Sequence, residues 1–359
     1  MKPITRAALA GIAGLTLVAA AACGSDNGAN KPTASKADCA KGEISGAGST
    51  FQQNIEQQWI KDYAATCSGA KINYQGTGSG AGIEQFGAGT IDFAGSDVTM
   101  KPDEQTKADT RCGGKAIHVP VTAGGIAIMY NLKDVKDLNL SAKTLAGIFQ
   151  GTIKKWDDPA IKADNPNAKL PSSSIAAYHR ADGSGTTKVF SGFLAANAGG
   201  DWKLGVDKQL GWKSGQAAKG SDGVTAGVKQ TEGAITYVEV SFAKANSLPT
   251  AKVKGAGSEF VELTSENVSK FLADAFTVTA TGNDLGGKLE FTGTTGYPIS
   301  TVSYVIVCEK GKDATKSALV RGYLAYAVGD GQAAADSLGF APLPTSIGDK
   351  VKATAKALS

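Results

Sequence analysis

The chain has 359 residues, of which 42% are hydrophobic, and a net charge of +4 at pH 7. This length is enough for one large core or two ordinary ones. The charge is too small for a protein that holds nucleic acid by electrostatic attraction, and no segment after residue 22 is apolar enough to span a membrane.

The N-terminal residues 1–22 predict an export signal. Lys2 and Arg6 precede an uncharged apolar stretch that is too short to span a membrane and ends in three alanines. Cys23 then follows, as in a bacterial lipobox, and we expect it to become the lipidated N-terminus. An ordinary signal peptide followed by an unrelated cysteine is the alternative. Removal of the signal lowers the net charge of +4 by two.

Residues 23–41 are predicted to be a lipid-anchored flexible leash. Gly, Ser, Asn, Thr, Lys and Pro dominate its sequence up to residue 38. Such a segment buries too little apolar surface to fold. Its mean reach as a flexible chain is about 20 Å.

The numbers and spacing of cysteines and histidines indicate which disulfides and metal sites the chain could form. An even number of cysteines after Cys23 in an exported chain predicts two disulfides, with three possible pairings. These cysteines are Cys39, Cys67, Cys112 and Cys308. No CxxC pair occurs and the chain has two histidines, so the sequence does not predict a structural zinc site.

One local design recurs three times along the chain. A short extended run ends in a turn of Gly, Ser and Thr, and an amphipathic helix follows. The turns lie at residues 46–50, 76–82 and 181–187. After the first turn, apolar residues recur every fourth position and predict a helix capped by Ser49 or Thr50. This stripe consists of Phe51, Ile55, Trp59 and Tyr63.

The remaining elements complete an α/β pattern. Strands are predicted at residues 72–75, 91–94, 119–121, 125–130, 175–180, 234–238 and 304–307. A helix is predicted at residues 317–328, with Leu319, Val320, Tyr323 and Leu324 facing inward. Strands that alternate with helical patterns favour α/β units over an all-β chain.

The three turns have the chemistry of an anion site. A helix N-terminus presents unpaired N–H groups and a positive dipole end, glycines allow close approach, and hydroxyls add donors. A single turn of this kind is equally explained as a capped helix. Arg180 strengthens the anion interpretation, because its planar fork suits a tetrahedral oxyanion, and Asp182 is placed to hold that fork. A surface ion pair is the alternative for these two residues.

Asp97 follows the predicted strand 91–94, and its carboxylate indicates which anion such a site would accept. A carboxylate repels an anion unless the ligand brings a proton. Phosphate at neutral pH has a proton to donate and sulfate has none, so an acceptor-only carboxylate would reject sulfate. An Asx turn that closes the strand explains Asp97 equally well.

Other functions are less well supported. The glycines of 76–82 with Asp97 loosely match a dinucleotide fingerprint. A phosphatase needs a base or metal, but no Gly-x-Ser-x-Gly elbow occurs. His179 neighbours Arg180 on a strand and so faces the other way, and His118 is interpreted as a strand or loop residue. A surface lipoprotein without a ligand leaves Arg180 and Asp97 unexplained. A secreted phosphatase and such a lipoprotein are kept as alternatives.

From about residue 42 onward the chain resembles the phosphate-binding proteins of ABC-type high-affinity phosphate uptake systems. The matching motifs are GAGSTF at 46–51, YQGTGSGAG at 74–82, GSD at 95–97, GTIKKWDD at 151–158, RADGSGT at 180–186, EGAITYV at 232–238 and GYPI at 296–299. Ser49, Gln52 and the two pairs of cysteines are less usual for this family.

The resemblance implies a binding protein rather than an enzyme, with no cofactor and no metal. It implies a monomer, lipid-anchored on the outer face of the cytoplasmic membrane, that captures inorganic phosphate and delivers it to the permease and ATPase subunits of an importer. The implied phosphate ligands are Thr50, Phe51, Ser79, Asp97, Arg180, Ser184, Gly185 and Thr186. Asp182 carries over as the residue that orients Arg180.

The implied fold is an α/β, two-domain, class II-like periplasmic-binding-protein fold with its ligand in the interdomain cleft. Two hinge crossovers are expected near residues 122–125 and 292–297. Domain I would comprise residues 42–124 and 297–359, and domain II residues 125–296. The first two cysteines flank the first strand and helix, and the last two fall in domain I. The favoured pairs are therefore Cys39–Cys67 and Cys112–Cys308.

Overall fold

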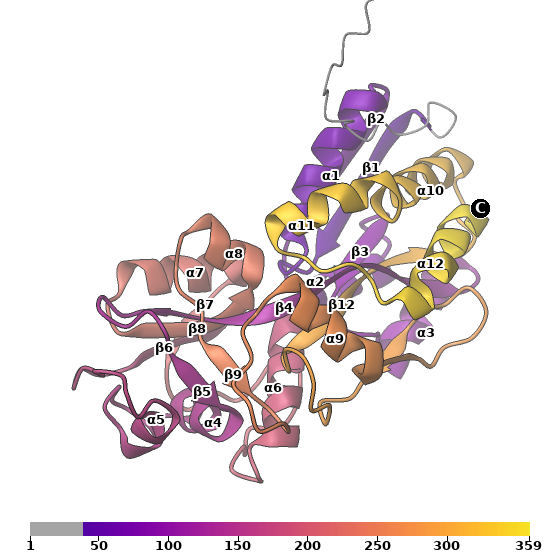
Figure 1. Cartoon of the computed structure of the whole chain (residues 1–359). Coiled ribbons are helices and arrows are strands. Elements are labelled where there is room, and N and C mark those ends of the chain that lie inside the picture. The colour runs from indigo at the N-terminus through magenta and orange to yellow at the C-terminus, as the bar shows by residue number, and fades with distance from the viewer. Residues whose placement is uncertain (1–38) are drawn as a thin grey trace, which may run out of the picture. The chain divides into compact units, whose positions relative to one another are not determined.

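A computed structural model of the chain describes residues 39–359 (Figure 1). The predicted signal segment, Cys23 and most of the predicted leash lie outside the described residues. Within residues 39–359, no helix combines the length and the apolar character that a membrane crossing needs.

The described residues form an alternating series of strands and helices. The strands are β1 (Gly42–Gly48), β2 (Ala70–Gly76), β3 (Phe93–Ser96), β4 (Ala116–Asn131), β5 (Asn139–Ser141), β6 (Ala176–Arg180), β7 (Gln216–Ala218), β8 (Ala234–Glu239), β9 (Lys252–Lys254), β10 (Phe276–Val278), β11 (Gly287–Leu289) and β12 (Ser300–Cys308). The helices are α1 (Gln53–Thr66), α2 (Ser79–Gly87), α3 (Pro102–Cys112), α4 (Ala142–Gln150), α5 (Pro159–Asp164), α6 (Gly185–Asn197), α7 (Gly220–Gln230), α8 (Val240–Ala245), α9 (Ser265–Ala275), α10 (Ala314–Ala327), the 3-10 helix η2 (Asp330–Ala334), α11 (Ala335–Leu338) and α12 (Thr345–Ala357).

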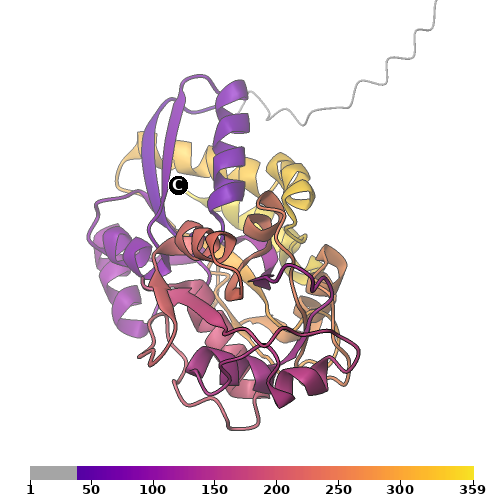
Figure 2. The same ribbon diagram turned by 90° about the vertical axis from the view of Figure 1, so that its left-hand side faces the viewer.

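Eight strands make one mixed sheet in the order β2-β1-β3-β12-β4-β8-β6-β7. We call β2, β1, β3 and β12 its first half and β8, β6 and β7 its second half. Strand β12 lies antiparallel between β3 and β4, and β4 joins the two halves (Figure 1). Figure 2 shows the indigo strands β1 and β2 running side by side next to α1. The mixed α/β organisation confirms the predicted class.

Strand β4 corrects the sequence prediction of two separate strands at 119–121 and 125–130. It is continuous and buried along almost its whole length. Up to Gly125 it pairs with β12, and from Ile126 onward it pairs with β8. The residues that suggested a break, Pro120 and the glycines before Ile126, lie in the strand, and the register with β12 shifts close to Pro120.

The apolar stripe of α1 is confirmed, because Ile55, Trp59 and Tyr63 are fully buried. The ring of Tyr63 packs edge-on against Tyr323 of α10, with ring centroids 5.7 Å apart. The predicted cap is wrong: the helix begins at Gln53 with Gln52 at the N-cap, and no side chain caps it. Ser49 and Thr50 lie before the helix and are used in the site described below.

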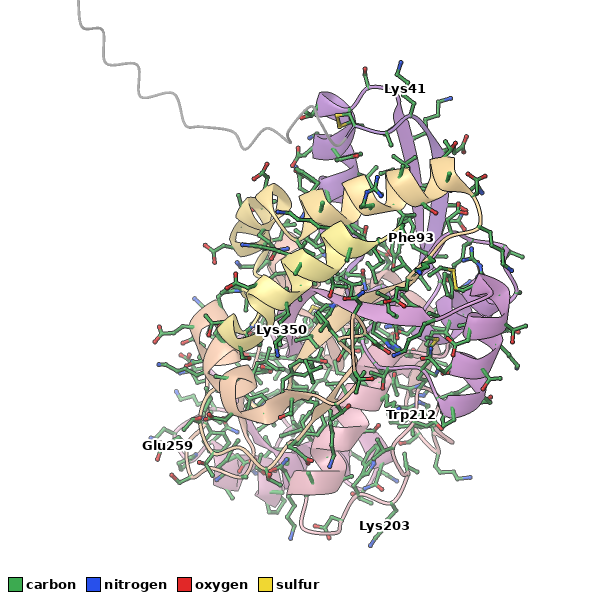
Figure 3. The ribbon with its side chains drawn as sticks, turned by 90° about the vertical axis from the view of Figure 1, so that its right-hand side faces the viewer. Lys41, Phe93, Lys203, Trp212, Glu259 and Lys350 are labelled. Carbon is green, nitrogen blue, oxygen red and sulfur yellow. A yellow bond between two sulfur atoms is a disulfide. The ribbon has the colours of Figure 1, made fainter. Side chains whose placement is uncertain are left out.

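Both favoured disulfides are present. Cys39 is bonded to Cys67, and Cys112 is bonded to Cys308. The first bond ties the chain before β1 to the end of α1, and the second ties the end of α3 to the end of β12. In Figure 3 the disulfides are drawn in yellow, Phe93 lies among packed side chains, and Glu259 lies at the margin of the molecule.

Candidate anion-binding site

The three predicted turns meet at the junction of the two halves of the sheet. The segment between β1 and α1, the start of α2 and the end of β3 come from the first half, and the start of α6 comes from the second half. The functional side chains there are all at most 4% exposed. They are Thr50, Ser79, Asp97, Arg180, Ser184 and Thr186.

Asp97 is the centre of this cluster. Its Oδ1 accepts hydrogen bonds from the hydroxyls of Ser49 and Ser303, the latter at 2.7 Å. Its Oδ2 accepts from the Thr186 hydroxyl at 3.0 Å. Burial raises the pKa of Asp97, while these three donors and the charge of Arg180 act against that rise. The carboxylate is therefore built into a network of hydroxyl donors rather than into an Asx turn.

Ser79 joins Asp97 to the start of α6. Its Oγ accepts from the backbone N–H of Asp97 at 3.3 Å and from that of Gly185 at 3.2 Å. Both lone pairs are thereby used, so the Ser79 hydroxyl can offer a hydrogen to an anion. A Cβ on Gly185 would lie 2.5 Å from Ser79 Oγ and 2.8 Å from Asp97 Cβ. Only glycine allows this close approach.

Arg180 ends β6 and is held by Asp182. Its Nε donates to Asp182 Oδ1 at 2.7 Å, and one terminal nitrogen donates to Oδ2. Asp182 Oδ1 also accepts from the N–H of Gly220 at 2.9 Å. Burial opposes ionisation of Asp182, but the guanidinium and the backbone donors prevail and lower its pKa. The remaining guanidinium N–H groups are left as donors for a ligand.

The N-terminus of α6 is held in place by its own side chains. Ser184 is the N-cap, and its Oγ accepts from the N–H of Thr187 at 3.1 Å. The Thr187 hydroxyl pairs with the Tyr237 hydroxyl at 2.7 Å, and Tyr237 accepts from the N–H of Arg180 at 3.2 Å. Tyr237 of β8 therefore links Arg180 to α6 from behind the site.

The first turn carries Thr50 and Phe51. Thr50 Oγ1 lies 2.8 Å from Ser221 Oγ and accepts from the Ser221 N–H at 3.1 Å, at the start of α7. The Phe51 N–H donates to Ser49 Oγ at 3.0 Å. The Phe51 ring is fully buried and packs edge-on against Phe340. This turn thus faces both the Asp97 cluster and the second half of the sheet.

The two histidines lie away from this cluster. His118 Nδ1 is 3.0 Å from Asp284 Oδ1, and its Nε2 accepts from the N–H of Met100. The His179 ring stacks on Trp212 at 4.6 Å, while Arg180 turns to Asp182, as their alternation on a strand predicted. Within residues 39–359, no group of three or more His, Cys, Asp or Glu side chains is arranged to hold a metal ion.

A cavity of about 250 Å³ opens beside Asp97. Its walls include Lys188 and Val189 of α6 and Thr301 and Tyr304 of β12. Lys101, directly before α3, pairs with Asp207 at 3.0 Å, and Lys208 pairs with Glu104 of α3. The cluster therefore lies where two parts of the molecule face one another.

Sequence reasoning found the turns and missed several of their partners. Ser303 and Ser221 are bonded to Asp97 and Thr50 from more than 170 residues away in the chain. Ser303 adjoins an apolar strand pattern, and Ser221 follows a glycine, as serines at the start of many helices do. Neither context marks the residue as part of a site. The sequence predicts only that Tyr237 lies in a buried strand. The GYPI and EGAITYV motifs pointed to the neighbourhood of Ser303 and to Tyr237, without indicating their contacts.

Comparison with known proteins agrees with this fold. Residues 33–330 match the PBP superfamily domain. Phosphate-binding protein PstS 3 of Mycobacterium leprae is 37% identical and is aligned over 94% of both chains. Phosphate-binding protein PstS of Xylella fastidiosa is 34% identical over 90% of this chain and 88% of its own.

Solved structures with the same fold are also phosphate-binding proteins. A high affinity periplasmic phosphate-binding protein, PfluDING, bound with phosphate, aligns with a TM-score of 0.71 and 25% identity over 87% of this chain and 93% of its own. A human phosphate binding apolipoprotein aligns with a TM-score of 0.70 and 26% identity over 86% of this chain and 93% of its own.

The match over most of its length shows that this chain belongs to the PBP superfamily. It has the two-domain periplasmic-binding-protein fold. Within that superfamily the chain is a member of the PstS family of phosphate-binding proteins.

Proposed function

We propose that this chain binds inorganic phosphate with high affinity outside the cytoplasmic membrane and delivers it to an ABC-type importer. The observation that carries the proposal is the convergence of Asp97, Arg180 and the N-termini of α2 and α6 on one buried cluster. Membership of the PstS family supports the choice of phosphate among oxyanions.

The ligand set that we propose is the one implied by the family motifs. It comprises Thr50, Phe51, Ser79, Asp97, Arg180, Ser184, Gly185 and Thr186, with Asp182 orienting Arg180. Arg180, the hydroxyls and the N–H groups donate to the phosphate oxygens, and Asp97 accepts a phosphate proton. Sulfate has no proton to give, so the same carboxylate repels it and is left without a donor.

The domain boundaries are part of the proposal. We place domain I at residues 42–124 and 297–359, and domain II at 125–296. The change of partner strand along β4 after Gly125 supports the first crossover. The Tyr297 hydroxyl donates to the Ile126 carbonyl at 2.8 Å, which supports a second crossover beside the first. Phosphate bound between the domains would favour hinge closure around it.

The remaining features concern location and partners. We propose that the protein is a monomer, anchored by lipid on Cys23, and that permease subunits receive its phosphate. We also propose that it has no enzymatic activity. In support of this, both histidines are engaged away from Asp97, at Asp284 and Trp212. A phosphatase would need such a base close to the ligand.

The test is calorimetric titration of the purified mature protein with phosphate, together with incubation with a chromogenic phosphate ester. We expect saturable binding of one phosphate per chain and no release of the chromophore. Absence of phosphate binding would refute the proposed function. Release of the chromophore by the purified protein would show that the protein is a phosphatase instead.

A further inference from the structure

Asp97 is held on the side away from Thr186 by a short relay of buried polar groups. Gln52 Nε2 donates to Ser303 Oγ at 2.8 Å, and Ser303 Oγ donates to Asp97 Oδ1 at 2.7 Å. Gln52 and Ser303 are both 0% exposed. A buried amide and a buried hydroxyl in series with a carboxylate need an explanation, because apolar side chains would fill the same space at lower cost.

The relay has a defined direction. Gln52 Nε2 also donates to the Tyr304 carbonyl at 3.0 Å, and a carbonyl can only accept, so the amide nitrogen must face β12. Ser303 Oγ therefore receives a hydrogen from Gln52. Its own single hydrogen is then directed to Asp97 Oδ1, since the alternative acceptor, the Ser96 carbonyl, is 3.4 Å away.

Local backbone features make room for the relay. The register of β12 against β4 shifts between Ser303 and Tyr304, and such irregularities re-aim side chains. Gly95 lies beside the Gln52 amide: a Cβ there would be 2.1 Å from the Tyr74 hydroxyl and 3.0 Å from Gln52 Cδ. The relay thus depends on a glycine directly before the Ser96–Asp97 segment.

The two oxygens of Asp97 are consequently not equivalent. Oδ1 is occupied by two protein hydroxyls of the first half, those of Ser49 and Ser303. Within residues 39–359, Oδ2 accepts a side-chain hydrogen bond from Thr186 alone, across the junction. Donors on Oδ1 favour the ionised form, and their removal would favour a neutral carboxyl. A neutral carboxyl can donate to an oxygen of either anion and would no longer reject sulfate.

We propose that Gln52 and Ser303 are specificity-determining residues that position Asp97 and keep it an acceptor-only group, so that phosphate is preferred over sulfate. Neither residue belongs to the proposed ligand set. The assignment rests on the proposed function and deepens it, because it explains how one carboxylate in a donor-rich site is maintained as an acceptor. It also gives a role to the buried Gln52 amide.

The experiment measures phosphate and sulfate affinities at one pH for wild type and four variants. Ser303→Ala removes the donor to Asp97, and Gln52→Met removes the donor to Ser303 while keeping the side-chain length. Ser303→Thr keeps the hydroxyl. Gln57→Met makes the same change at an exposed position of α1, the helix that begins directly after Gln52. Thermal melting without anion identifies any variant that fails to fold.

Loss of one hydrogen bond to a charged group changes an equilibrium constant by about tenfold or more. The ratio of phosphate affinity to sulfate affinity should therefore fall by about tenfold in Ser303→Ala. Gln52→Met should lower it less, by about threefold, because Ser303 can still donate in a weakened bond. Ser303→Thr and Gln57→Met should leave it unchanged. An unchanged ratio in folded Ser303→Ala and Gln52→Met would overturn the assignment while leaving the proposed function intact. Wild type that binds no phosphate would overturn both.

Discussion

Thr186 donates its hydroxyl hydrogen to Oδ2 of Asp97 at 3.0 Å, across 89 residues of sequence. Thr186 lies in the first turn of α6, which packs beside the second half of the sheet, and Asp97 directly follows β3 of the first half. Under the proposed function, a phosphate that donates its proton to Asp97 would share or take this oxygen, and the Thr186 hydroxyl would then donate to the phosphate instead. The two proposed ligand residues are thus bonded directly to each other across the junction.

Arg180 should supply the main compensating charge for the anion. Replacing it in Arg180→Ala leaves phosphate oxygens unpaired in a buried site and should weaken phosphate binding by more than about a hundredfold. Arg180→Lys should recover only part of the loss, because an ammonium lacks the planar fork. Calorimetric titration measures both. Arg321→Ala, which removes an equal charge from an exposed position of α10, is the control. An Arg180→Ala variant within threefold of wild type would exclude Arg180 from the site.

Two buried glutamates should make the protein less stable as pH rises. Burial raises the pKa of Glu56 to about 7 and that of Glu239 to about 8, from 4.5. Between pH 4.5 and these values the folded state binds more protons than the unfolded state, so the free energy of unfolding falls with rising pH. Below pH 4.5 both states are protonated and this penalty is absent.

Glu56→Gln isolates one of these contributions. A shift from 4.5 to about 7 corresponds to about 3 kcal/mol, so the variant should gain stability of that order relative to wild type between pH 5 and pH 8. Urea unfolding at the two pH values measures the gain. Glu84→Gln, at an exposed position of α2, should show no such change. If the variant and wild type keep parallel pH profiles, Glu56 is ionised in the folded protein throughout this range.

The Cys39–Cys67 bond should stabilise the first half of the sheet. The two cysteines are 28 residues apart, and closing a loop of this length is worth about 3–4 kcal/mol in the chain-entropy account. The double variant Cys39→Ala, Cys67→Ala should lose that stability in denaturant unfolding and still bind phosphate, because neither residue touches the Asp97 cluster. Recovery of a Cys39–Cys112 peptide from the oxidised protein would contradict the pairing.

The proposed anchor is tested at Cys23. Dual acylation at this residue would hold the protein firmly on the membrane. Cys23→Ala should therefore leave an unprocessed precursor that does not label with palmitate. Wild type expressed in the same cells should label and fractionate with membranes. Palmitate incorporation by the variant would show that the lipid is attached elsewhere.

The sequence predicted the elements better than it predicted their partners. Gly, Ser and Thr before an apolar helical stripe are local signals, and they located α2 and α6, although these helices begin at Ser79 and Gly185, inside the predicted turns. The same reasoning misplaced the cap of α1, because Ser49 and Thr50 bond to Asp97 and Ser221 instead of to the helix. Local pattern cannot distinguish a capping hydroxyl from one that serves a distant side chain.

The limits are clearest at β4 and β12. Pro120 and Gly124–Gly125 suggested a break, but pairing with β12 and then with β8 keeps β4 continuous. Insertion of β12 between β3 and β4 brings Ser303 to Asp97, although the two are 206 residues apart. The hydrophobic periodicity of a sequence does not predict which distant strands pair. Arg180 and Asp182 were found because two residues of one turn are close in sequence as well as in space.

The most direct test of the account compares phosphate and sulfate binding in wild type and Asp97→Asn at one pH. Asparagine keeps a carbonyl acceptor, removes the negative charge and adds a donor, so phosphate can still bind while sulfate loses its repulsion and gains a partner. We expect wild type to bind phosphate and reject sulfate, and the phosphate-to-sulfate ratio to fall strongly in the variant even if phosphate affinity changes little. A ratio that is the same in both proteins would contradict the account, because Asp97 would then be structural and selection against sulfate would arise elsewhere.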